Sequence, residues 1–132
     1  GPIGIGAYGG KHREVLPGWT ASIKALSACP NVYVKLGGLG MRLGGFGFHE
    51  HSEPPSSETL ATTWRPYIDR CINAFGSSRC MFESNFPVDK GSYSYPVFWN
   101  ACKLLTKGAS DAEKADLFSG AATRFYRLDL PG

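Results

Sequence analysis

The sequence has no apolar run approaching the roughly 20 residues that a membrane-spanning helix needs, so it predicts no membrane segment. No positively charged stretch precedes an apolar one near the beginning, and we expect no signal peptide. Charge of one sign is also scarce, because 14 Lys and Arg against 11 Asp and Glu leave a net charge of only +3. The basic residues are scattered, so we expect no nucleic-acid-binding surface.

Cysteine pairs of the CxxC type are absent as well. Each of the four cysteines lies in an apolar segment rather than in a loop framework: Cys29, Cys71, Cys80 and Cys102. We expect buried thiols in a reducing compartment, which predicts a cytoplasmic protein. The G-x-S-x-G motif is also missing, so nothing indicates a nucleophilic triad.

Apolar and aromatic residues, in contrast, make up 42% and 13% of the 132 positions. This content excludes a disordered chain and suffices for the core of one domain. Glycine gathers in residues 1–10 and 37–47, where it predicts loops. Gly4, Gly6 and Gly9 match the dinucleotide pattern G-x-G-x-x-G, but no strand precedes them and no acid follows at the required distance. A loop is the better interpretation.

Hydrophobic periodicity predicts helices that alternate with short strands. In order, we expect a helix to about residue 28, a strand at 31–36, a helix from Ser56 or Ser57 to Phe75, kinked or restarted at Pro66, a strand at 79–84, and helices at 96–107, 111–118 and 121–128. Gly76 fits a helix end, and Ser110 with Glu113 fits a capping box. Strands separated by helices predict parallel pairing. Two parallel strands leave two open edges, so the order predicts an α/β fold that is part of a larger sheet or barrel.

Candidate functional residues follow the two predicted strands. Glu83 and Asn85 come at the carboxyl end of the second strand, where ligands bind in α/β folds. Period 2 puts both on one side, where they act as a general base or metal ligand, or form a structural hydrogen-bonding cluster. Lys35, near the end of the first strand, binds an anionic substrate or extends away from the sheet.

Histidines add a second candidate site. His49 and His51 form an HxH pattern in a Gly- and Pro-rich loop, for which metal binding, substrate contact and plain solvent exposure all remain open. His12 has no partner nearby in the sequence and is predicted to be a surface residue.

Three segments resemble a known family: NVYVKLGGL at 31–39, RCMFESNFPV at 79–88 and GAATRFYRL at 120–128. They look like the C-terminal part of the amidohydrolase-related TIM-barrel hydrolases, the branch with 2-pyrone-4,6-dicarboxylate lactonase and aminocarboxymuconate decarboxylase relatives. The resemblance implies that residues 1–132 form one partial domain, the C-terminal segment of a (β/α)8 barrel. The two strands would then be barrel strands 7 and 8, with flanking helices.

The resemblance also implies site roles, with two departures from the family pattern. The family's histidines on strands 1, 5 and 6 are absent, so a metal ligand set is not present, although a divalent metal such as zinc occurs in the family. Asn85 stands where the family usually has an aspartate, and an amide cannot take a proton as a carboxylate does. We expect Asn85 and Glu83 to act in catalysis. The expected substrate-binding residues are Lys35, Arg42, His49 and His51.

The function implied is hydrolysis of a lactone or amide bond, C–O or C–N, in a small carboxylated compound by activated water. Non-oxidative decarboxylation, as in the same branch, is one alternative. The other is a non-catalytic barrel fragment that serves packing or assembly. A small-molecule substrate is the expected partner, and homo-oligomerisation stays open.

Overall fold

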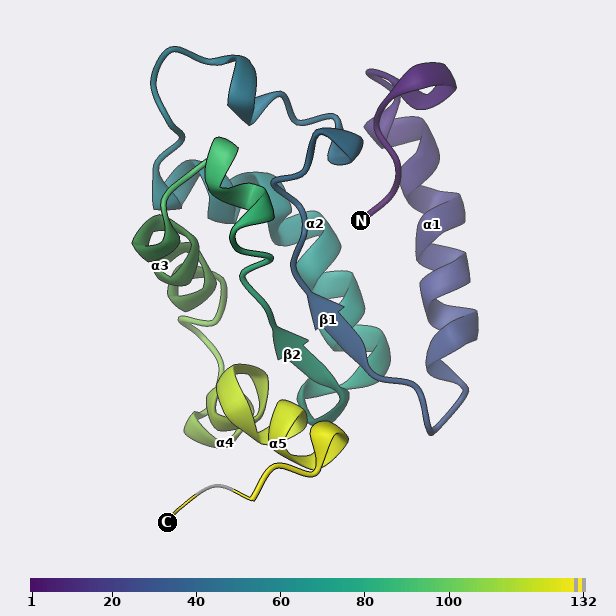
Figure 1. Cartoon of the computed structure of the whole chain (residues 1–132). Helices are drawn as coiled ribbons and strands as arrows, with labels where there is room; N and C mark the ends of the chain where they lie inside the picture. Colours follow the sequence, from purple (N-terminus) through teal and green to yellow (C-terminus); the bar gives the residue numbers. More distant parts are fainter. Residues whose placement is uncertain (130, 132) are drawn as a thin grey trace.

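Two parallel strands and five α-helices form the chain in the computed structural model, which describes residues 1–129 and 131 (Figure 1). The elements in order are α1 (His12–Ser27), β1 (Val34–Leu36), α2 (Ser57–Phe75), β2 (Cys80–Phe82), α3 (Tyr95–Leu105), α4 (Asp111–Ala115) and α5 (Ala121–Tyr126). A π-helical turn, Asp116–Gly120, joins α4 to α5. The order helix, strand, helix, strand and then helices is the one expected from the periodicity.

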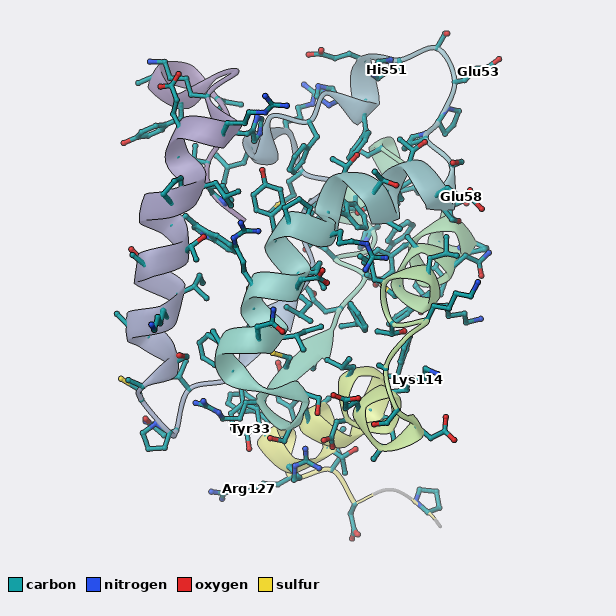
Figure 2. The ribbon with its side chains drawn as sticks, turned by 180° about the vertical axis from the view of Figure 1, so that it is seen from behind. Tyr33, His51, Glu53, Glu58, Lys114 and Arg127 are labelled. Carbon is teal, nitrogen blue, oxygen red and sulfur yellow. The ribbon has the colours of Figure 1, made fainter. Side chains whose placement is uncertain are left out.

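The strands form a β–α–β unit whose two faces differ. β1 pairs with β2 in parallel, with Lys35 opposite Met81 and Leu36 opposite Phe82. Leu36 and Phe82 belong to the main core. They face α2, which lies behind the strands in Figure 1 and in front of them in Figure 2. Because side chains alternate along a strand, Lys35 and Met81 lie on the opposite face.

The core between α2 and α3 is largely aromatic. Trp64 of α2, 2% exposed, packs edge-on against Tyr93, with ring centroids 5.4 Å apart, and against Phe48 at 6.3 Å. Phe98 of α3 stacks on Tyr93 at 6.2 Å. Such pairs stabilise a core by about 0.5–1.5 kcal/mol each beyond the area they bury. Tyr93 therefore fixes the loop after β2 to the helices.

The helix boundaries that depend on local chemistry are confirmed. The Ser56 side chain accepts a hydrogen bond from Thr59 N at the start of α2. Gly76 ends this helix at φ 77°, a conformation that favours glycine. Ser110 and Glu113 form the capping box of α4, and hydrogen bonds from the backbone and side chain of Ser110 lower the pKa of the Glu113 carboxyl.

Other boundaries differ from the prediction or were left open by it. α1, for which only an end near residue 28 was predicted, begins at His12 and contains Pro17. α2 runs through Pro66 as one helix, so the helix does not restart there. Both strands are three residues long and so shorter than expected, because pairing stops where the loops diverge. The helix expected at 111–118 changes to π-helical turns at Asp116.

The cysteines are free, as expected, but Cys29 is exposed at the end of α1 and only the other three are buried. Burial raises the pKa of the Cys80 thiol to about 12 and also raises the pKa of Cys102. Across the described residues, no helix combines the length and apolar character needed to cross a membrane.

Candidate functional site

Two loops begin at the carboxyl ends of β1 and β2 and lie at the same end of the strand pair (Figure 1). The first begins at Gly37, and the second begins at Glu83. A Cβ at Gly37 would lie 2.5 Å from Glu83 Cγ and 2.8 Å from Glu83 Oε1. Only a glycine therefore lets the first loop pass the Glu83 side chain at this distance.

Lys35 and Glu83 form an ion pair on the face of the strands opposite α2. The Lys35 Nζ atom lies 3.5 Å from Glu83 Oε2, and the two side chains are 54% and 28% exposed. The register explains the pair, because Lys35 lies opposite Met81 and Glu83 follows two residues later on the same side. A carboxylate and an ammonium group thus stand together at the strand ends.

Asn85, two residues after Glu83, adopts a backbone conformation that is uncommon for residues other than glycine. Its φ is 54°, which asparagine tolerates better than most residues. Its side-chain Nδ2 donates a 2.8 Å hydrogen bond to Asp89 Oδ1. A Cβ added at Gly38 would lie 3.7 Å from Asn85 Nδ2, so the amide packs against this turn. Glu83 and Asn85 therefore flank the same Gly37–Gly38 dipeptide.

Asp89 is the centre of a buried network that the sequence analysis missed. Its side chain is 1% exposed and accepts hydrogen bonds from Asn85, from Tyr93 Oη at 2.6 Å and from Gly40 N at 3.2 Å. Three donors offset the cost of burying a carboxylate. Burial, with the hydrogen bond to Asp89, raises the pKa of Tyr93, which stays a neutral donor. The spacing of four residues from Asn85 to Asp89 to Tyr93 was the available signal.

Gly40 ties the two loops together. Besides donating to Asp89, it accepts a 2.7 Å hydrogen bond from Ser92 Oγ through its carbonyl oxygen. The loop after β1 is thereby held to the loop after β2, and residues from both loops keep a fixed relative position.

A groove of about 530 Å³ lies between the same loops and brings Arg42 and His49 together. Its lining comes from Gly40, Met41, Arg42, Leu43, His49, Val88, Gly91 and Ser92. His49 Nε2 is 3.6 Å from Glu50 Oε1, and the histidine side chain is 19% exposed.

His51 does not join that groove lining. It is exposed at the outer rim of the loop, near Glu53 (Figure 2). In the part of the chain that the structure describes, no three His, Cys, Asp or Glu side chains are grouped as a metal would require.

His12 has a structural role that its place in the sequence did not indicate. Its Nε2 lies 2.7 Å from Gly44 O, and its ring stacks on Phe46 with centroids 4.9 Å apart. It therefore attaches the start of α1 to the loop after β1 and is not simply a surface residue.

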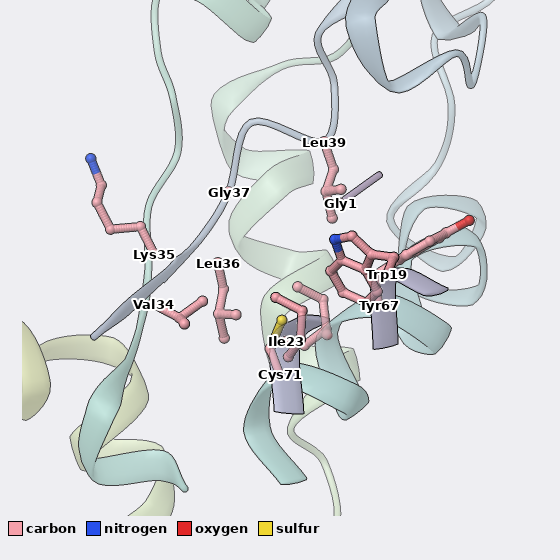
Figure 3. Close-up of a pocket in the computed structure, with 11 residues that line it drawn as sticks. Gly1, Trp19, Ile23, Val34, Lys35, Leu36, Gly37, Leu39, Tyr67 and Cys71 are labelled. Carbon is pink, nitrogen blue, oxygen red and sulfur yellow. The ribbon is translucent and has the colours of Figure 1, made fainter. Parts of the chain in front are cut away.

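A second hollow, of about 100 Å³, lies between α1, α2 and β1 (Figure 3). Trp19, Ile23, Leu39, Tyr67 and Cys71 give it an apolar lining. Burial raises the pKa of the Cys71 thiol, which keeps it in its unreactive neutral form. Lys35 and Gly37 also border this hollow, which therefore adjoins the candidate site, although Glu83 and Asn85 are not part of its lining.

Comparisons with known proteins agree with one another. A family model described as Amidohydrolase matches residues 4–128. The uncharacterized protein y4mH of Sinorhizobium fredii is 42% identical over 125 residues, which cover 95% of this chain and 37% of that protein. An L-fucono-1,5-lactonase of Burkholderia ambifaria is 31% identical over 120 residues, which cover 86% of this chain and 36% of the lactonase.

Solved structures give the same result. A Burkholderia multivorans amidohydrolase with bound zinc matches with a TM-score of 0.73 and 28% identity, over 86% of this chain and 38% of that one. A second crystal form of that protein with bound HEPES matches with a TM-score of 0.76 and 27% identity, over 90% and 39% of the two chains. The chain thus spans just over a third of the length of these relatives.

The zinc of that relative has no complete set of ligands here. Within residues 1–129 and 131, Glu83 is the one carboxylate at the strand ends with an accessible side chain, since Asp89 is buried with its oxygens already bonded. The described residues alone do not fit a zinc ion.

Proposed function

This chain belongs to the amidohydrolase family, and from that premise we propose that it contributes the carboxyl-end residues of a hydrolase active site. In this proposal residues 1–132 form one partial domain, the C-terminal segment of a (β/α)8 barrel. β1 and β2 are barrel strands 7 and 8. The face that carries Lys35 and Met81 then points into the barrel, and the two loops form part of its mouth.

The substrate we propose is a small carboxylated compound with a lactone bond. Two lactonase relatives at 31% identity support the C–O bond over an amide C–N bond. The observation that carries the proposal is the juxtaposition of Lys35, Glu83 and Asn85 at the ends of adjacent parallel strands. Ligands bind at that end of the strands in α/β barrels.

Glu83 is the proposed general base. It accepts a proton from a water molecule while the water oxygen bonds to the lactone carbonyl carbon and the carbonyl oxygen takes up the electron pair. The Lys35 ammonium, 3.5 Å from Glu83, stabilises that negative charge. When the ring C–O bond then breaks, the proton passes from Glu83 to the leaving ring oxygen. One water is consumed, and the product is an open-chain hydroxy acid.

Arg42 and His49 are the proposed binding residues for the substrate carboxylate. They line one groove between the two loops, and a guanidinium group matches a carboxylate with two parallel hydrogen bonds. His51, exposed at the rim, completes the proposed set as a contact for a substrate group that extends toward solvent.

The test is hydrolysis of a panel of small lactones that carry a free carboxylate, with L-fucono-1,5-lactone as the uncharged comparison, by the whole encoded protein that contains these residues. Acid release is followed with a pH indicator, and the uncatalysed rate is subtracted. We expect Glu83→Gln to lower kcat roughly 100-fold. Glu53→Gln changes an exposed carboxylate on the loop and is the matched control, for which we expect an unchanged kcat.

The alternatives give different results in the same assay. Release of carbon dioxide from a carboxylated substrate whose lactone ring stays closed would replace hydrolysis with non-oxidative decarboxylation. A protein that turns over no substrate of either class would support a packing or assembly role. An unchanged kcat in Glu83→Gln would remove Glu83 as the base.

A further inference from the structure

The Asn85 side-chain amide forms a hydrogen bond through its nitrogen, while its oxygen has no hydrogen-bond partner among the described residues. Its Nδ2 donates to Asp89 Oδ1 at 2.8 Å. No group in residues 1–129 or 131 donates a side-chain hydrogen bond to its Oδ1 atom, and this oxygen is not among the buried polar atoms that lack a partner. The carbonyl oxygen of the amide is therefore accessible to solvent.

Asp89 determines which atom of the Asn85 amide, Nδ2 or Oδ1, forms this hydrogen bond. A carboxylate only accepts hydrogen bonds, so the amide must turn its nitrogen toward Asp89. The carboxylate itself cannot rotate freely, because its Oδ2 accepts from Tyr93 Oη at 2.6 Å and from Gly40 N at 3.2 Å. The aromatic core in turn fixes the Tyr93 ring, which stacks on Phe98 and meets Trp64 edge-on.

We propose that Asp89 is the positioning residue that makes Asn85 a hydrogen-bond acceptor in the active site, while Gly40 and Tyr93 hold the Asp89 carboxylate. This inference rests on the proposed function. Asn85 Oδ1 accepts one hydrogen of the attacking water, while Glu83, on the other side of the Gly37–Gly38 turn, removes the other. Asn85 thus orients the water without taking a proton, which an amide is unable to do.

Asp89→Asn tests this reasoning with little change in shape. The new amide at position 89 satisfies Tyr93 and Gly40 only if its oxygen faces them, which turns its nitrogen toward Asn85. The Asn85 amide must then rotate, and its NH2 group replaces the oxygen in the active site. Because every hydrogen bond in the network keeps a partner, we expect an unchanged melting temperature. We expect kcat to fall about 100-fold and KM to stay within about twofold.

The exchanged pair Asn85→Asp/Asp89→Asn is the rescue. Its amide at position 89 donates to the carboxylate at position 85, whose second oxygen again faces the active site. We expect kcat within about tenfold of the unaltered protein. Asn85→Asp alone puts two carboxylates in contact, so we expect it to be as inactive as Asp89→Asn.

An activity-independent readout is the exchange of the Asn85 side-chain amide protons with solvent, measured by NMR. We expect slow exchange in the unaltered protein, where the NH2 is bonded to Asp89, and fast exchange in Asp89→Asn. Tyr93→Phe removes one donor to Oδ2 but leaves the Asn85 bond, so it should keep the slow exchange and most of kcat.

The outcomes separate the two proposals. If the unaltered protein hydrolyses no lactone, the proposed function fails, and slow exchange still decides the orientation of Asn85. Fast exchange in the unaltered protein, or a normal kcat in Asp89→Asn, would overturn the inference. An equal loss of kcat and melting temperature in Asp89→Asn and Tyr93→Phe would reduce the network to a structural role and overturn it as well.

Discussion

Arg79, between α2 and β2, is predicted to hold the other end of the strand pair together. Its guanidinium donates to Ser27 O and Cys29 O, each at 2.9 Å, and to Val32 O at 3.3 Å. Its Nε donates to Phe75 O at 3.2 Å. Ser27 ends α1 and Phe75 ends α2, so a positive charge meets carbonyl groups at the negative ends of two helices.

Arg79→Met keeps the aliphatic stem and removes all four hydrogen bonds. The two short bonds contribute about 1–1.5 kcal/mol each, and the longer pair adds less because water reaches those carbonyls after the change. We therefore expect the free energy of unfolding to fall by about 3 kcal/mol. For a chain of this length that corresponds to a melting temperature lower by about 10 °C. Circular dichroism at 222 nm during heating and urea titration measure both quantities.

The matched control is Arg70→Met. Arg70 makes one hydrogen bond, 2.7 Å to Pro66 O within its own helix, and its loss should cost about 0.5 kcal/mol or less. Arg79→Lys keeps the charge but not the planar fork, so we expect about half the effect of Arg79→Met. A melting temperature within about 3 °C of the unaltered protein for Arg79→Met would refute the reasoning, since two helix ends would then be held by other contacts.

Two further predictions follow from close packing and from burial. Gly37→Ala places a methyl group 2.5 Å from Glu83 Cγ, so we expect about 2 kcal/mol of destabilisation in urea titration and a lower kcat. The control is Gly18→Ala in α1, where the space around the residue is open and the change should stabilise the chain by about 0.5 kcal/mol. Burial raises the pKa of Cys80 from 9.0 to about 12, so the thiol stays neutral in the folded chain while the unfolded chain ionises. Stability should therefore fall as pH rises from about 9 toward 12, and thermal melts of Cys80→Val across that range should show a smaller decline.

Features that depend on neighbours in the sequence could be predicted. The α2 start at Ser56, its end at Gly76 and the Ser110 capping box each need only a few consecutive residues. The ion pair between Lys35 and Glu83 was not predicted. It follows from parallel register and period 2 only once the two distant strands are paired.

The rest of the candidate site depends on contacts between distant segments. Asp89 is buried because Gly40, 49 residues earlier, donates to it and because the Tyr93 ring enters the aromatic core. Neither fact follows from the sequence around Asp89, which is polar and reads as an exposed turn. The HxH pattern could not decide among metal binding, substrate contact and solvent exposure for the same reason, since the turn at Phe48–Glu50 leaves His49 half-buried and His51 exposed.

The loops after the two strands act as one unit because Gly40 bonds to both sides of the second loop. Its N–H and its carbonyl oxygen are used by Asp89 and Ser92, and a Cβ on it would lie 2.5 Å from Tyr93 Cε1. The aromatic core is therefore linked to the strand ends by a chain of contacts: the Tyr93 ring packs in the core, Tyr93 donates to Asp89, and Asp89 accepts from Asn85. Rigid support of this kind keeps a polar side chain in one orientation before substrate binds. A supported Asn85 therefore presents its oxygen in a fixed direction, whereas an unsupported, exposed asparagine would rotate.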